Sequence, residues 1–148
     1  MSNVPMKRTQ KPTKIDTFNK NATKIKEALY ETGIDIFRWD CLDFAVGLGE
    51  AVEPNKKHTL RCSWFNEKRA SYSHCGLIWK ENFCDGDGCI PTRNEKEIID
   101  KLYQYMFGTS EQKSKWKVEI AELPHTKLEK LIERNTVESV KETVRRFL

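Results

Sequence analysis

The sequence lacks any apolar run of the roughly 18 residues that a membrane-spanning helix requires, so no segment is predicted to cross a membrane. Residues 1–24 also lack the apolar stretch of a secretory signal. Together these two absences predict a cytoplasmic protein in a reducing compartment. Clustered cysteines in such a compartment are metal ligands or core residues more often than disulfides.

Several catalytic motifs are missing as well. The chain has no P-loop, no Gly-rich dinucleotide motif and no nucleophile elbow. Asp85 and Asp87 form the only close DxD pair of acidic residues in the sequence. The chain around them is too short to build the fold that two-metal phosphoryl transfer requires. We therefore interpret them as turn residues. His74 could pair with a cysteine as base and nucleophile, but nothing in the sequence orients such a pair. The sequence therefore predicts no catalytic activity.

The composition is that of a globular protein. The chain has 148 residues, of which 32% are charged and 38% are hydrophobic, which is enough to bury one core. We predict an α+β fold: a small antiparallel sheet with a zinc-ribbon-like hairpin flanked by helices, followed by a C-terminal strand and a long helix. The predicted organisation is a disordered basic arm (1–19), a zinc-ribbon-like domain (20–110) and a strand–helix extension (111–148).

The elements follow from hydrophobic spacing and from breaking residues. Helical spacing covers 22–32 and 39–50, and the second run is expected to be broken by Gly47 and Gly49. A further helix begins after Asn94, which has Glu97 three residues on and so forms a capping box. The remaining elements are alternating strands at 58–65, 70–79 and 115–123 and an amphipathic helix at 125–148 that the pair 135–136 could divide.

Residues 61–89 are the most unusual segment, because they contain four of the five cysteines, one of the three histidines and two of the four tryptophans. Zinc takes four nitrogen or sulfur ligands, which commonly come from two sequence-local pairs. Cys84 and Cys89 enclose the residues DGDG, whose glycines allow a tight turn that directs two thiolates to one point. The sequence therefore predicts bound zinc, with these two cysteines as one pair of ligands.

The second pair of ligands depends on the hairpin between the first two strands. A five-residue loop would place Cys62 directly opposite His74, with Cβ atoms about 5 Å apart, and Trp64 opposite Tyr72. Two ligands at that separation can share one metal ion. We therefore expect Cys62 and His74 to complete the zinc site.

The fourth ligand stays open at this point, because a three-residue loop would pair Cys62 with Tyr72 instead. Cys75 and His58 are the alternatives. Cys75 points to the other face of a regular strand from its neighbour, and His58 lies shortly before Cys62. Cys41, within a helical run, is expected to be a core residue.

The segment C-S-W-F-N-E-K-R-A-S-Y resembles the segment C-P-F-H-N-E-K-T-P-S-F in the zinc-binding domain of bacterial and phage DNA primases. Cys62, the run 66–68, Ser71 and an aromatic residue at Tyr72 occur at the same spacing. The resemblance covers roughly residues 38–107, and the family's second ligand would fall on Phe65. It implies a zinc-containing, replication-related domain without a polymerase centre.

Charge is distributed unevenly around the net value of +4. Residues 1–26 carry seven Lys or Arg and one Asp, whereas residues 27–53 carry one Arg and seven acidic residues. Residues 54–80 carry six Lys or Arg and one Glu, and this second basic block overlaps the cysteine-rich segment. A basic arm next to a basic, aromatic strand surface is typical of proteins that bind nucleic acid.

The sequence thus predicts a zinc protein that binds nucleic acid, preferentially single-stranded DNA. Basic side chains would contact phosphates and aromatic side chains would stack on bases. The predicted contact residues are Arg61, Trp64, Phe65, Lys68, Arg69, Tyr72, Trp79 and Lys80. The alternative is a small phage or plasmid factor that docks on a host enzyme through the strand and helix at 116–148.

Overall fold

The computed structural model describes residues 12–36, 40–64, 72–104, 121–123 and 129–148. The fold mixes helices with an antiparallel sheet, so the predicted α+β class is confirmed. The described helices are α1 (Lys14–Glu31), α2 (Cys41–Val52), α3 (Glu95–Gln104) and α6 (Arg134–Phe147). The strands are β1 (Thr59–Trp64), β2 (Tyr72–Trp79), β3 (Asn82–Asp85), β4 (Gly88–Pro91) and β5 (Ala121–Leu123).

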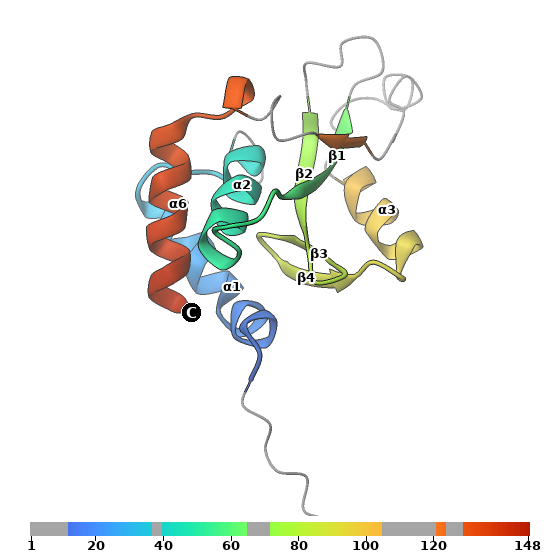
Figure 1. The fold of residues 1–148 in the computed structure, drawn as a ribbon, viewed down its shortest axis with the longest axis horizontal. Helices are drawn as coiled ribbons and strands as arrows, with labels where there is room; N and C mark the ends of the chain where they lie inside the picture. Colours follow the sequence, from blue (N-terminus) through green and yellow to red (C-terminus); the bar gives the residue numbers. More distant parts are fainter. Residues whose placement is uncertain (1–11, 37–39, 65–71, 105–120, 124–128) are drawn as a thin grey trace, which may run out of the picture.

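The strands form one sheet in the order β4-β3-β2-β1-β5, and every pair is antiparallel. Helices α1, α2 and α6 lie together on one side of the sheet, and α3 lies on the other side (Figure 1). The side chains of the larger core fill the space under the three helices, and a smaller cluster around Phe83, Ile98 and Leu102 lies under α3. None of the helices in the described ranges is long and apolar enough to cross a membrane.

Helix α1 begins inside the segment that was predicted to be a disordered arm. Thr13 caps it: its hydroxyl accepts a hydrogen bond from the Asp16 backbone N–H, and the Asp16 carboxylate accepts one from the Thr13 N–H. This reciprocal pair satisfies two amide groups that otherwise lack partners at a helix start. Phe18, Ile25 and Leu29 then bury one stripe of the helix completely. The boundary predicted at residue 19 is therefore wrong for residues 14–19, while residues 1–11 lie outside the described part.

The C-terminal segment is part of the same core. Strand β5 pairs with β1, opposite Leu60, Arg61 and Cys62. Helix α6 buries Val137, Val140 and Val144 against α2 and α1. An amphipathic helix needs such an apolar partner, so the described part of the extension predicted at 111–148 shares its core with the preceding helices.

Two glycines expected to break the second helix lie inside α2 instead. A Cβ on Gly47 would come within 2.6 Å of the Cβ of Val140, and a Cβ on Gly49 would come within 2.8 Å of the His58 ring. Real Cβ atoms do not approach other atoms so closely, so glycine is required for these contacts. The close approach of α6 to Gly47 and of His58 to Gly49 therefore explains why glycines occur inside this helix.

Replacing Gly47 with alanine tests this explanation. Alanine is the better helix former by about 1 kcal/mol, so an exposed position would be stabilised. Here we expect a loss of about 1–3 kcal/mol of unfolding free energy, because the added methyl group overpacks the contact with Val140. Denaturant titration of both proteins measures the difference. A stabilised variant would show that α2 and α6 do not pack this closely.

Candidate active site

A β-bulge in the first hairpin decides which side chains of β2 face each helix layer. Trp64 lies opposite Tyr72 as expected, but Ser63 lies opposite His74 and Cys62 lies opposite Cys75. The register therefore shifts by one residue, and Ser73 is the extra residue of β2. A one-residue shift moves every following side chain to the other face of the sheet. The expectation that Cys62 faces His74 is wrong for this reason.

His74 consequently points to the α3 side of the sheet, where it meets Asp85. Its Nε2 lies 2.8 Å from Oδ2 of Asp85, the last residue of β3. Both side chains are only 1% exposed. Asp85 alternates with Cys84 along β3, so it shares the face of Phe83 and α3. The residue interpreted as part of a turn is therefore a buried partner of the histidine.

Two donors hold the Asp85 carboxylate in place. Its Oδ1 accepts a hydrogen bond of 3.0 Å from the backbone N–H of Asp87 and one of 2.8 Å from Nζ of Lys101. Burial raises the pKa of Asp85, but the hydrogen bond and charge of His74, together with Lys101, outweigh it and leave the pKa below its usual value. The carboxylate is therefore ionised at neutral pH.

Cys41, the first residue of α2, lies against the same histidine. The side chains of Cys75 and His74 and the backbone of Cys75 lie close enough to act on its thiol. The Cys41 thiol therefore lies beside residues 74 and 75 of β2.

These contacts favour a thiolate on Cys41. The hydrogen bond from the Cys75 side chain lowers the pKa of Cys41 to about 5, against the effect of burial, and His74 adds to the lowering. The N-terminus of a helix further favours negative charge. Burial lowers the pKa of His74, but Asp85 and Cys41 raise it more, so its pKa lies above the ordinary value. A thiolate on Cys41 is thus favoured, beside an imidazole whose affinity for a proton is increased.

The other two cysteines of this cluster are of a different kind. Burial and the neighbouring side chains of Cys41 and Cys62 raise the pKa of Cys75 well above that of an ordinary thiol. Cys75 therefore remains protonated and donates its S–H to the Cys41 sulfur. Cys62 lies beside it in the core, and neither side chain is more than 1% exposed. Cys41 is the cysteine of this cluster whose surroundings activate it.

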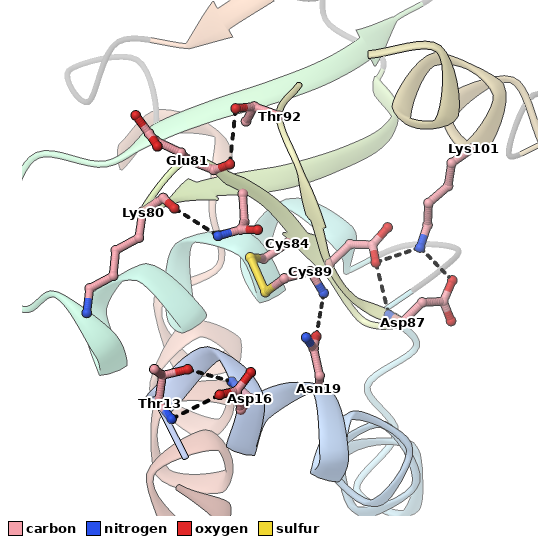
Figure 2. Close-up of a disulfide and its surroundings, with 12 residues drawn as sticks. Thr13, Asp16, Asn19, Lys80, Glu81, Cys84, Asp87, Cys89, Thr92 and Lys101 are labelled. Carbon is pink, nitrogen blue, oxygen red and sulfur yellow. Dashed lines mark hydrogen bonds and ion pairs between the residues drawn. A yellow bond between two sulfur atoms is a disulfide. The ribbon is translucent and has the colours of Figure 1, made fainter. Parts of the chain in front are cut away.

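Cys84 and Cys89, the first predicted pair of zinc ligands, form a disulfide across the β3–β4 hairpin (Figure 2). They lie directly opposite each other in the strand pairing, with Cα atoms 4.1 Å apart. The backbone N–H of Cys89 donates a 2.7 Å hydrogen bond to Asn19 of α1. Disulfide sulfurs are not thiolates, so in this state the pair does not bind zinc.

The four predicted zinc ligands are therefore not brought together. Cys62 faces the large core, His74 faces α3, and the other two are bonded to each other. Neither alternative fourth ligand completes the zinc site, because Cys75 lies next to Cys41 and His58 lies against Gly49. Within the described residues no group of three or more His, Cys, Asp or Glu side chains could hold a metal ion. Zinc binding stays a prediction from the sequence, which elemental analysis would test.

The residues predicted to contact nucleic acid are only partly described. Trp79 is 1% exposed and packs edge-on against Phe18, with ring centroids 6.4 Å apart, so it cannot stack on a base. The reason is that it shares the face of Cys75 and Leu77, which α1 covers. Arg61 is half-buried and Lys80 is exposed in the β2–β3 turn. The remaining side chains (Trp64, Phe65, Lys68, Arg69 and Tyr72) lie outside the described part.

Comparison with known proteins adds no family: no family model, no curated protein and no solved structure matches the chain. The resemblance to primase zinc domains therefore stays a prediction. What can be said of function rests on the Cys41, His74 and Asp85 arrangement itself.

The disulfide gives one testable prediction. The intact protein purified without reductant should be lighter than the fully reduced form by the mass of two hydrogen atoms, and the same difference should appear in the single tryptic peptide 81–93 that contains both Cys84 and Cys89. Tryptic mapping with and without reductant measures this. As a control, Cys62 should be found unlinked. Recovery of all five cysteines as thiols would contradict the bridge.

The pKa of Cys41 gives a second prediction. Its alkylation by iodoacetamide should reach half of its maximal rate near pH 5, because the thiolate is already formed there. In a Cys75→Ala variant that midpoint should move to higher pH, since the hydrogen bond that lowers the pKa of Cys41 most is lost. Mass spectrometry of labelled peptides assigns the site, and thermal melting checks that the variant is folded. A midpoint near that of a free thiol in the parent protein would contradict the geometry.

Proposed function

We propose that the protein is a cysteine-dependent enzyme that cleaves or transfers an acyl group through a thioester on Cys41. One observation supports this function above others. A thiol at the start of a helix lies near a histidine that lowers its pKa, and a buried carboxylate 2.8 Å from Nε2 of that histidine orients the ring. Nucleophile, base and orienting carboxylate in this sequence of contacts are the requirements of nucleophilic acyl transfer.

In the first half of the reaction the Cys41 thiolate would attack the carbonyl carbon of an ester or amide. A carbon–sulfur bond forms and the electron pair of the carbonyl moves to its oxygen. Backbone N–H groups in the first turn of α2 have no acceptor within the helix, so they are suited to stabilise that oxyanion. His74 then donates its proton to the leaving alcohol or amine as the carbon–heteroatom bond breaks.

In the second half His74 accepts a proton from a water molecule or another acceptor nucleophile. That nucleophile attacks the thioester, and Cys41 leaves as the thiolate. Asp85 stays ionised throughout and stabilises the positive charge on the imidazole when it forms. The role of Asp85 is therefore to fix the ring orientation and the charge of His74.

This proposal departs from the sequence-based expectation of no catalytic activity. That expectation depended on the lack of a residue to orient a Cys–His pair. Asp85 supplies the orientation, although it follows His74 by eleven residues and belongs to a different strand. Nucleic-acid binding and docking on a host enzyme remain predictions, with no described contact that favours one over the other.

An activated ester tests the proposal. With p-nitrophenyl acetate, the parent protein should release nitrophenol in a burst and gain one acetyl group on Cys41, because the thioester forms faster than it hydrolyses. Cys41→Ala should abolish the burst. His74→Gln and Asp85→Asn should reduce the acylation rate by roughly 100-fold or more.

The matched control is Asp100→Asn, which removes an exposed carboxylate from α3 and should leave acylation unchanged. Circular dichroism melts of each variant separate loss of chemistry from loss of fold. A folded parent protein without a burst, or a burst that survives in Cys41→Ala, would overturn the proposed enzyme.

A further inference from the structure

Lys101 joins α3 to the buried pair of His74 and Asp85. It is the seventh residue of a helix that begins at Glu95, and its side chain is 13% exposed. Its Nζ lies 2.9 Å from Oδ2 of Asp87 (Figure 2). The same Nζ lies 2.8 Å from Oδ1 of Asp85. The ammonium group therefore spans two carboxylates, one fully buried and one at the surface.

The contact divides the Asp85 carboxylate between two partners. Oδ2 is directed at His74, and Oδ1 is held by Lys101 and by the N–H of Asp87. A carboxylate bonded through both oxygens cannot rotate about its side-chain bond without losing one partner. Lys101 thereby limits the orientation of the oxygen that fixes the histidine.

The charge of Lys101 also acts on His74 through Asp85. A buried ion pair is costly to break, because the remaining charge is left without compensation in a medium of low dielectric constant. The positive charge of Lys101 offsets part of the negative charge of Asp85, so the carboxylate stabilises a protonated His74 less strongly than it would alone. The charged and titratable groups facing His74 are Asp85 from β3 and Cys41 from α2, with Lys101 from α3 behind Asp85.

We propose that Lys101 is a positioning residue of the Cys41 site, which holds Asp85 in the orientation that His74 requires and moderates the charge that Asp85 presents to it. The inference rests on the proposed function. It makes α3 a necessary part of the site, although no side chain of that helix touches Cys41 in any described contact.

Three variants separate this role from a merely structural one. Lys101→Met keeps most of the side-chain stem and removes the charge, Lys101→Arg keeps the charge, and Lys96→Met removes an exposed lysine from the same helix as a control. The readouts are the NMR signals of the His74 ring and the rate of acetylation of Cys41 by p-nitrophenyl acetate. Melting temperatures are recorded for all three.

In Lys101→Met we expect the imidazolium form of His74 to persist to higher pH by about one unit, because an opposing positive charge has been removed near Asp85. The acylation rate should fall roughly 10- to 100-fold as Asp85 loses its fixed orientation. Lys101→Arg should restore the histidine signal and most of the rate. Lys96→Met should match the parent protein in both.

The outcomes distinguish the two proposals. If Cys41 of the parent is acylated but Lys101→Met changes neither the histidine signal nor the rate, the role of Lys101 is overturned and the enzyme stands. If Lys101→Arg is as impaired as Lys101→Met, the charge is not what matters and the role is likewise overturned. If Cys41 of the parent is not acylated at all, the proposed function fails, and the role of Lys101 fails with it.

Discussion

The extra residue at Ser73 is the constraint on which the candidate site depends. It shifts the pairing of β1 and β2 by one position, so that Cys75 lies opposite Cys62 and His74 turns to the other face. In the unshifted register His74 would lie under α2 with the cysteines, far from the carboxylate at the end of β3. A single bulge therefore separates the thiols of Cys62 and Cys75 from the imidazole–carboxylate pair.

Burial makes these contacts strong and also makes them interdependent. His74 and Asp85 are almost completely excluded from solvent, so each charge requires its partner. The positive and negative groups alternate from the Cys41 thiolate through His74 and Asp85 to Lys101. The β3–β4 hairpin that carries Asp85 is in turn closed by the Cys84–Cys89 disulfide and bonded to Asn19 of α1. The site is thus supported from both layers of helices.

Local signals predicted the elements whose stability is local. The helix expected after Asn94 forms as α3, and the apolar stripe expected at the C-terminus forms α6. The Asn94 side-chain amide donates a hydrogen bond to the Glu97 carboxylate, which is not the side chain–backbone pairing of a capping box. The strands β3 and β4 were missed because the turn before β3 lacks the usual signal. Lys80 and Glu81 occupy it with φ values of 47° and 61°, a conformation that normally selects Asn or Gly. Because the sequence does not indicate that turn, it predicts neither the strand that contains Asp85 nor the contact of Asp85 with His74.

The sequence by itself determined the α+β class, the capped and amphipathic helices, and the concentration of cysteine, histidine and acidic residues in one segment. These properties depend on composition and on spacing over a few residues. Only the tertiary structure decided which of those residues meet. Cys41 and His74 are far apart in the chain. The face of the sheet on which His74 lies depends on a β-bulge that no residue type in the sequence indicates. A one-residue register shift leaves the hydrophobic pattern almost unchanged and yet exchanges the two faces of a strand, which is why Cys62 is a core thiol and His74 a partner of Asp85. Cys84 and Cys89 form a disulfide because the pairing of β3 with β4, which the sequence does not reveal, places them directly opposite each other.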